Sequence, residues 1–319
     1  MAQTDSPGGA AALKPISPTS GVVQAKLRGE RFRLGDYLFH GILVLTLLIA
    51  IAILFLLFGS VATKGIPVLT DRGANFFTTS NSSFPFNAGV KQAVIGSLEL
   101  MLFVVVFAVP LGVGAAVYLE EYARDTRFTR FVVTNVRNLA GVPSIVYGIL
   151  GLIIFVEFLR PITGGLTVIS GGLTLSVVVL PIVIITSSEA LRAVPDGIRE
   201  AGFGVGATRW EVIRSHVLPY AAPGIFTGVI LTLGRAIGET APLLLVGAIL
   251  GFFAPGNVGF LGQLRGPYTS LPTLIFNWST QAKTDFRGLT AAAIIVLMGV
   301  ILLVNATAIF LRNRYERRW

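Results

Sequence analysis

Long apolar stretches recur six times along the chain, separated by shorter segments rich in polar and basic residues. Each stretch reaches the roughly 18 residues that a helix needs to cross the hydrocarbon core of a bilayer. The first is apolar on every side, so it has no stripe that would face water. Glycine and proline residues inside several stretches are tolerated where neighbouring membrane helices pack against them. The pattern therefore predicts an all-α polytopic membrane protein with six transmembrane helices, over residues 41–58, 100–119, 139–156, 166–187, 224–253 and 291–311.

The composition agrees with a membrane location. Of the 319 residues, 53% are hydrophobic and 13% are charged, which is about half the charged share of a soluble domain. The chain has no cysteine, and this excludes a disulfide framework and a thiolate metal site. The sequence contains no G-x-x-x-x-G-K-[ST], H-E-x-x-H or G-x-S-x-G pattern. We therefore expect that this chain is not an enzyme and that it binds neither a metal nor a cofactor. Any ATP that drives it is expected to bind a partner subunit.

The placement of charge predicts the topology. Of the 25 Lys and Arg residues, 17 fall in the terminal segments and in the loops after the second and fourth stretches, and seven fall in loops on the other side of the predicted membrane. The excess of basic residues on one side places both termini in the cytoplasm, so the net charge of +9 needs no nucleic-acid partner. Residues 1–34 are predicted to be a disordered basic cytoplasmic tail, and residues 35–319 a single six-helix domain.

The most informative polar segment is 195–219, between the fourth and fifth stretches. Thr208 and Glu211 form a capping box, which predicts a helix that begins just after Thr208. Gly204 and Gly206 separate this helix from a shorter one before it. The segment is therefore predicted to be a helix–turn–helix on the cytoplasmic surface. On physical grounds it could dock into a groove of a soluble partner or contact only lipid headgroups.

The same segment resembles the EAA loop of bacterial ABC-transporter permeases, whose pattern is E-A-A, three residues, G, nine residues, I, one residue, L-P. Five positions match: Glu200, Ala201, Gly206, Leu218 and Pro219. Gly202 stands where the second Ala is usual and His216 where Ile is usual, and the spacing is kept. The resemblance implies the architecture of a type I (MetI-like) importer permease. It also implies that a coupling helix is seated on an ATPase through Glu200, Ala201, Gly206, Thr208, Arg209, Leu218 and Pro219.

Further stretches resemble phosphate permeases of the PstA type, from about residue 90 to the end of the chain. They are RAIGETAPLL at 235–244, LAGVPSIVYG at 139–148 and LPTLIF at 271–276. The sister PstC permeases share R-A-x-G-E-T and usually lack the A-P-L-L that follows. The resemblance implies phosphate transport across the plasma membrane of a bacterial cell. It implies three protein partners: a PstC-like permease, a PstB-like ATPase and a PstS-like phosphate-binding protein.

Arg235 and Glu239 are the candidate residues of the translocation path. They are four positions apart, so they share one face of a helix, and Arg235 falls near the middle of the predicted fifth span. A lone charge at that depth costs at least a few kcal/mol. Two interpretations stay open: an ion pair that fixes the helix orientation, or the polar lining of a solute path. Asn305 in the last span is expected to bridge helices.

Two other functions stay open from the sequence. An ABC permease for another oxyanion, such as molybdate or sulfate, would have the same fold and different residues along the path. A membrane-embedded enzyme or a stand-alone channel is the second alternative. The EAA-like segment and the lack of a catalytic motif argue against it.

Overall fold

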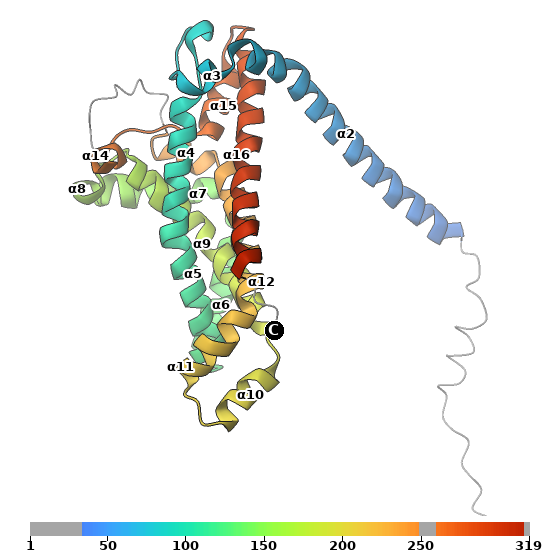
Figure 1. The fold of residues 1–319 in the computed structure, drawn as a ribbon, viewed down its shortest axis with the longest axis vertical. Helices are drawn as coiled ribbons and strands as arrows, with labels where there is room; N and C mark the ends of the chain where they lie inside the picture. The colour runs from blue at the N-terminus through green and yellow to red at the C-terminus, as the bar shows by residue number, and fades with distance from the viewer. Residues whose placement is uncertain (1–33, 249–259, 316–319) are drawn as a thin grey trace, which may run out of the picture. The chain divides into compact units, whose positions relative to one another are not determined.

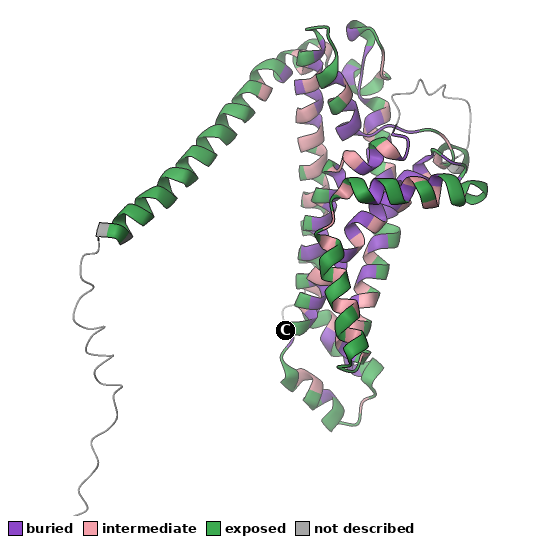
Figure 2. Cartoon of the chain, turned by 180° about the vertical axis from the view of Figure 1, so that it is seen from behind, coloured by how far each residue is buried: buried purple, intermediate pink, exposed green. Residues whose placement is uncertain are grey.

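The structure is a computed structural model that describes residues 34–248 and 260–315. Residues 1–33 of the predicted tail and residues 249–253 of the predicted fifth span lie outside the described residues. The chain divides into two compact units, residues 1–58 and 59–319. The described part of the first unit belongs to α2 (Leu34–Arg72), a helix of 39 residues. Its described side chains up to Phe58 are all exposed (Figure 2), as an apolar helix would be that faces lipid.

The described part of the second unit is helical apart from an isolated β-bridge between Ala248 and Tyr268. Figure 1 shows α3 and α15 at one end of this unit and α10 and α11 at the other. In chain order the elements after α2 are α3 (Ala74–Thr78), η1 (Pro85–Asn87), α4 (Lys91–Phe103), η2 (Val104–Ala108), α5 (Val109–Val117), η3 (Tyr118–Tyr122), α6 (Arg127–Ala140), α7 (Ser144–Gly151), η4 (Leu152–Phe158), α8 (Arg160–Thr163), α9 (Val168–Arg192), α10 (Asp196–Gly204), α11 (Arg209–Val212), η5 (Ile213–Val217), α12 (Leu218–Gly238), α13 (Ala241–Leu245), α14 (Phe260–Leu264), α15 (Leu271–Thr280) and α16 (Phe286–Tyr315).

Five helices of the described chain are long and apolar enough to cross a membrane, and a bent pair gives a sixth span if its two parts count as one. This confirms the predicted all-helical membrane fold. The first, second, fourth and sixth spans run longer than the apolar stretches that predicted them, because further turns extend the helices at their ends. The five helices are Tyr37–Arg72, Lys91–Tyr122, Val168–Arg192, Arg209–Gly238 and Phe286–Arg314.

The third predicted span, over residues 139–156, is not one straight helix. It divides between α6 and the continuous run of α7 and η4, and these two parts meet at an angle of 101°. Pro143 explains the bend, because a proline disfavours helical backbone in the residue before it and Pro143 itself is the N-cap of α7. The Tyr147 hydroxyl donates a hydrogen bond of 2.8 Å to the Leu139 carbonyl and so ties α7 back to α6.

The fifth span begins earlier than the predicted boundary at Gly224. The helix starts at Arg209 and runs without a break through α11, η5 and α12 to Gly238. The second helix of the predicted helix–turn–helix is therefore the first part of this span and not a separate surface helix. The apolar pattern starts late because the first turns carry polar residues such as Glu211 and Arg214.

Wide π-helical turns accommodate two prolines inside the long helices. The π-helical segment η2 ends two residues before Pro110, and η5 ends two residues before Pro219. Proline has no N–H to donate, and its ring clashes with the carbonyl four residues earlier. Those carbonyls belong to Val106 and Ser215, inside the two π-helical segments. A local π turn moves the carbonyl away and lets the helix continue.

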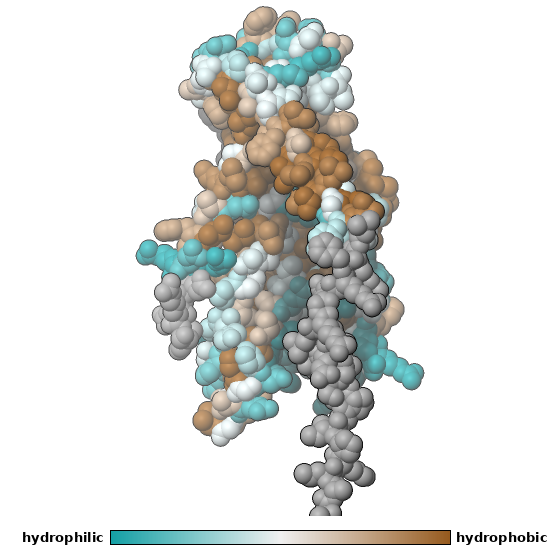
Figure 3. Space-filling view, turned by 90° about the vertical axis from the view of Figure 1, so that its right-hand side faces the viewer, coloured by the Kyte–Doolittle hydropathy of each residue, from teal (hydrophilic) through white to brown (hydrophobic). Residues whose placement is uncertain are grey.

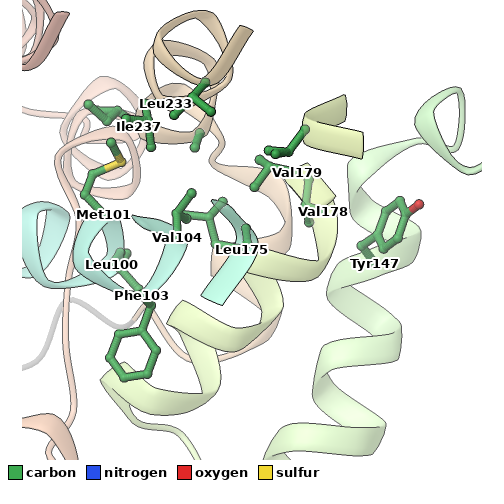
Figure 4. Packing of buried hydrophobic residues seen from close by; sticks show 14 of the residues in the cluster. Leu100, Met101, Phe103, Val104, Tyr147, Leu175, Val178, Val179, Leu233 and Ile237 are labelled. Atoms are coloured by element: carbon green, nitrogen blue, oxygen red, sulfur yellow. The ribbon is translucent and has the colours of Figure 1, made fainter. Parts of the chain in front are cut away.

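Helix α9 is the centre of the main core and contacts α4, α5, α6, α7 and α12. Glycines let these helices approach closely: a Cβ on Gly112 would lie 2.6 Å from Val183 Cγ1, and a Cβ on Gly228 would lie 2.5 Å from Thr186 Oγ1. Figure 4 shows Leu100, Met101 and Val104 of the second span packed with residues of α9 and α12, namely Leu175, Val179, Leu233 and Ile237.

A second, smaller core lies at the α3 and α15 end of the bundle. Phe76, Trp278 and Phe286 are fully or almost fully buried there. The Trp278 indole N–H donates a hydrogen bond of 3.1 Å to Asn81 Oδ1, which holds the loop after α3 against α15. On the face drawn in Figure 3, hydrophilic residues gather around the tip of this end.

Candidate functional site

The charged pair singled out in the sequence forms at the end of α12. Arg235 lies in the last turn of the helix, and Glu239 is the residue that caps it. Arg235 Nε lies 3.3 Å from Glu239 Oε1, with the Arg235 side chain 60% exposed and that of Glu239 15% exposed. A cation in the last turn of a helix also interacts favourably with the helix dipole. Helix termination and ion pairing thus coincide at one place.

The pair lies at the middle of the bundle. A Cβ on Gly224 would lie 2.9 Å from Ala190 Cβ, and Gly228 faces Thr186 four residues earlier in α9. Helices α9 and α12 are therefore antiparallel, and each residue further along α12 faces one residue earlier in α9. In this register Arg235 lies level with Val179. That residue is next to the midpoint of α9 (Val168–Arg192). The expected mid-span depth of Arg235 is thus consistent with helix packing, although the helix begins 15 residues earlier than predicted.

The chain breaks its helical path at this depth. Helix α12 ends at Gly238, and the short α13 begins at Ala241. Glu239 has an extended backbone, with φ −72° and ψ 119°, and its N–H donates to the Ala236 carbonyl. Membrane transporters place substrate sites at such interruptions, because the freed backbone groups and nearby side chains need polar partners.

Asn305 of α16 lies beside the same turn. A Cβ on Gly234 would lie 3.4 Å from Asn305 Nδ2, so the amide rests against the backbone next to Arg235. Asn305 Oδ1 is buried and has no hydrogen-bond partner within the described part of the chain. The expected hydrogen bond between helices is thus not made by this oxygen, and a polar acceptor remains close to the charged pair.

The residues proposed for coupling lie at the opposite end of the bundle from α15. Glu200 and Ala201 are exposed on α10, and Gly206 turns the chain with φ +83°. The capping box is confirmed: the Thr208 N–H donates to Glu211 Oε2 at 2.7 Å, and the Glu211 N–H donates to Thr208 Oγ1 at 3.4 Å. Most of this segment is open to solvent (Figure 2).

The remaining coupling residues continue into the span. Arg209 is the first residue of α11, while Leu218 and Pro219 begin α12. Gly202 stands where the EAA pattern has Ala, and a Cβ there would lie 2.7 Å from Val212 Cγ2. The glycine therefore lets α10 approach α11 closely. His216 is exposed in η5. Among the described residues, no group of three or more His, Cys, Asp or Glu side chains could hold a metal ion.

Sequence reasoning missed the residues that fasten this segment to the bundle. Glu120 binds Arg192 and Glu121 binds Arg199, at 2.8 Å and 2.7 Å. The hydrogen bond that Arg199 donates to Glu121 raises the pKa of Arg199 above its ordinary value, so the guanidinium stays charged. The signal was present: two adjacent carboxylates end an apolar span on the side where basic residues dominate.

Comparison with known proteins gives the family. Residues 108–318 match the family model of the binding-protein-dependent transport system inner membrane component. The chain is 32% identical over 284 residues to the "Probable ABC transporter permease protein YqgI" of Bacillus subtilis, covering 86% of this chain and 94% of that protein. It is 34% identical over 255 residues to the phosphate transport system permease protein PstA of Xylella fastidiosa, covering 79% and 84%.

A PstC permease and a solved transporter also match. The phosphate transport system permease protein PstC of Mesorhizobium japonicum is 30% identical over 322 residues, covering 91% of this chain and 93% of that protein. The fold resembles that of a chain in the inward-facing MetNI methionine ABC transporter, with a TM-score of 0.56 and 20% identity over 74% of this chain and all of that one. The chain belongs to the family of binding-protein-dependent transport system inner membrane components, the permease subunits of ABC importers.

Proposed function

We propose that this protein is the permease subunit of an ATP-driven importer of inorganic phosphate and forms half of its translocation path. The similarity to PstA permeases supports the phosphate substrate. The chain is also similar to a PstC permease and to a permease whose name gives no solute. The choice of phosphate therefore depends on the residues of the path.

The observation that carries the proposal is the exposed Arg235 at the mid-bundle end of α12. A planar guanidinium binds phosphate oxygens through paired N–H donors. Glu239 partly neutralises the arginine and repels an anion, so the pair would hold phosphate weakly enough to release it. Weak binding suits a site through which the solute passes, whereas tight binding would slow its release.

The proposed partners are those of a phosphate importer, and two of them would dock at opposite ends of the second unit. The segment 195–219 would dock on a PstB-like ATPase, which binds and hydrolyses the ATP, while this chain binds no cofactor. A PstC-like permease would supply the other half of the path. A PstS-like phosphate-binding protein would dock at the α3 and α15 end. Both termini would lie in the cytoplasm, with the helices in the plasma membrane. ATP binding favours one of two conformations, and the path opens alternately to each side.

The test is phosphate uptake by the reconstituted complex. Arg235→Ala should lower the maximal uptake rate at least tenfold, which corresponds to about 1.4 kcal/mol, and Arg235→Lys should retain part of it. Arg265→Ala is the matched control, because Arg265 is an exposed arginine outside the long helices. Unchanged uptake in Arg235→Ala would exclude this role for Arg235.

Competition identifies the solute. Unlabelled phosphate should suppress uptake of labelled phosphate, and equal concentrations of sulfate or molybdate should not. Uptake of labelled sulfate or molybdate, with no uptake of labelled phosphate, would show that the protein imports another oxyanion.

A further inference from the structure

Three consecutive residues at the end of the second span each contact a different part of the segment that leads to the fifth span. Glu120 contacts Arg192 at the end of α9, Glu121 contacts Arg199 in α10, and the Tyr122 ring contacts Arg209 at the start of α11. We call Glu120, Glu121 and Tyr122 the η3 anchor. The contacts join positions that are more than 70 residues apart in the sequence.

The first contact is a two-pronged ion pair. Arg192 Nε donates to Glu120 Oε2 and Arg192 Nη2 donates to Glu120 Oε1, both at 2.8 Å. The Glu120 side chain is 14% exposed, and that of Arg192 is 49% exposed. Paired parallel hydrogen bonds of this kind fix the relative orientation of the two groups as well as their distance. The end of the second span is therefore fixed to the end of α9.

The second contact is the most buried one and reaches α10 itself. The Glu121 carboxylate is 7% exposed and accepts from Arg199 Nη2 at 2.7 Å. The same guanidinium donates to the Leu191 and Val194 carbonyls, at 3.0 and 2.8 Å. Arg199 thus connects three points at once: the second span, the C-terminal end of α9, and α10.

The third contact fastens the start of the fifth span. The Arg209 guanidinium carbon lies 5.4 Å from the centre of the Tyr122 ring, within the range of a cation–π interaction. Helix α10 also packs on the start of the fifth span, where Gly202 is buried against Val212, and Ile198 packs on the main core. A displacement of α10 would therefore act on the fifth span directly and on η3 through Arg199 and Glu121.

The second span carries such a displacement towards the proposed path. It is a continuous helix from Lys91 to Tyr122. About a third of the way along it, Leu100 and Met101 line a small cavity with Ala236 and Ile237, the two residues that follow Arg235 (Figure 4 shows Leu100, Met101 and Ile237). A shift of this helix along its axis would change the packing beside the charged pair.

We propose that the η3 anchor transmits the movement of α10 to the second span, with Glu121 and Arg199 as the positioning residues of ATP-driven transport. The proposal rests on the proposed function, because it assumes that an ATPase moves α10. A buried ion pair adds little net stability compared with an apolar pair of the same size. Its contribution here is a fixed geometry between two elements that must move together.

The experiment measures the number of phosphate ions taken up per ATP hydrolysed by the reconstituted complex. In Glu121→Gln, ATP hydrolysis should continue, and uptake per ATP should fall at least fivefold. Glu121→Asp, which keeps the charge, should recover part of the loss. The matched control is Asp125→Asn, because Asp125 pairs with Arg130 at 3.1 Å on the surface. This control should keep the wild-type ratio.

A double-mutant cycle tests whether the pair acts as a unit. Glu121→Gln, Arg199→Gln and the double variant should all lose coupling to the same degree. An unchanged ratio in Glu121→Gln, or strictly additive losses, would overturn the proposal. If Glu121→Gln does not assemble, Glu120→Gln is scored by the same criteria, since its partner Arg192 is half exposed. A wild-type complex that moves no phosphate would refute the proposed function instead.

Discussion

Arg235 meets the structural requirements of an ion pair and also those of the transport role proposed above. Its charge costs least where three conditions meet: a carboxylate within 4 Å, the end of a helix, and access to water. The end of α12 supplies them, with Glu239 at 3.3 Å and the Arg235 side chain 60% exposed. The ion pair therefore exists, as one interpretation of the sequence required. Its exposure leaves guanidinium N–H groups free to meet an anion, as the other interpretation required.

Gly206 is the residue at which docking of the ATPase can be tested separately. Its φ of +83° favours glycine, and a Cβ there would meet no atom of the described chain within 4 Å. Gly206→Glu should therefore abolish co-purification of the ATPase, because the long charged side chain strains this turn and projects into the proposed docking surface. Gly206→Asn should retain it, since asparagine tolerates this backbone conformation. An ATPase that stays bound to Gly206→Glu would contradict the coupling assignment.

At the scale of elements, the bend in one span and the start of another depend on packing and backbone chemistry, which hydrophobic periodicity does not report. The apolar run at residues 139–156 hides the 101° bend between α6 and α7, because hydrophobicity does not report the direction of a helix. The fifth span was expected to start at Gly224, yet its helix starts at Arg209. The capping box at Thr208 marked that start from the sequence alone. Local capping chemistry was thus a better guide to this helix than its apolar content.

Glycine packing in the second span offers a stability test with an internal control. A Cβ on Gly112 would lie 2.6 Å from Val183 Cγ1, whereas a Cβ on Gly114 would meet nothing within 4 Å of it in the described structure. Gly112→Ala should destabilise the protein by about 1–3 kcal/mol through overpacking. Gly114→Ala should be neutral or stabilising by up to about 1 kcal/mol, because alanine favours helix. Thermal unfolding in detergent measures both. Equal effects would contradict the packing of α5 on α9.

For the whole molecule, the sequence was sufficient for the fold class and for the pairing of Arg235 with Glu239. It was insufficient for the connections between distant parts. Hydropathy predicts spans because each helix satisfies its own backbone in lipid. The pairing of Glu121 with Arg199 joins positions 78 residues apart, and such a contact depends on how the helices pack. A single sequence carries no record of that packing.

The predicted topology can be tested because the chain has no cysteine. Phe86 is 85% exposed and Val205 is 84% exposed, at opposite ends of the second unit. In intact cells that lack the partner subunits, a membrane-impermeant maleimide should label Phe86→Cys and leave Val205→Cys unlabelled. Inverted membrane vesicles should give the opposite pattern. Labelling of Val205→Cys from outside would show that the orientation is the reverse of the predicted one. Helix α10 would then be out of reach of any cytoplasmic ATPase.

The central claim is that a separate ATPase drives this permease through the segment 195–219. Its most direct test is phosphate accumulation in proteoliposomes that contain both permeases and the binding protein, measured with and without the ATPase subunit. Uphill accumulation should require both the ATPase and ATP, and it should be lost in Gly206→Glu. Uphill accumulation in the absence of the ATPase would contradict the central claim.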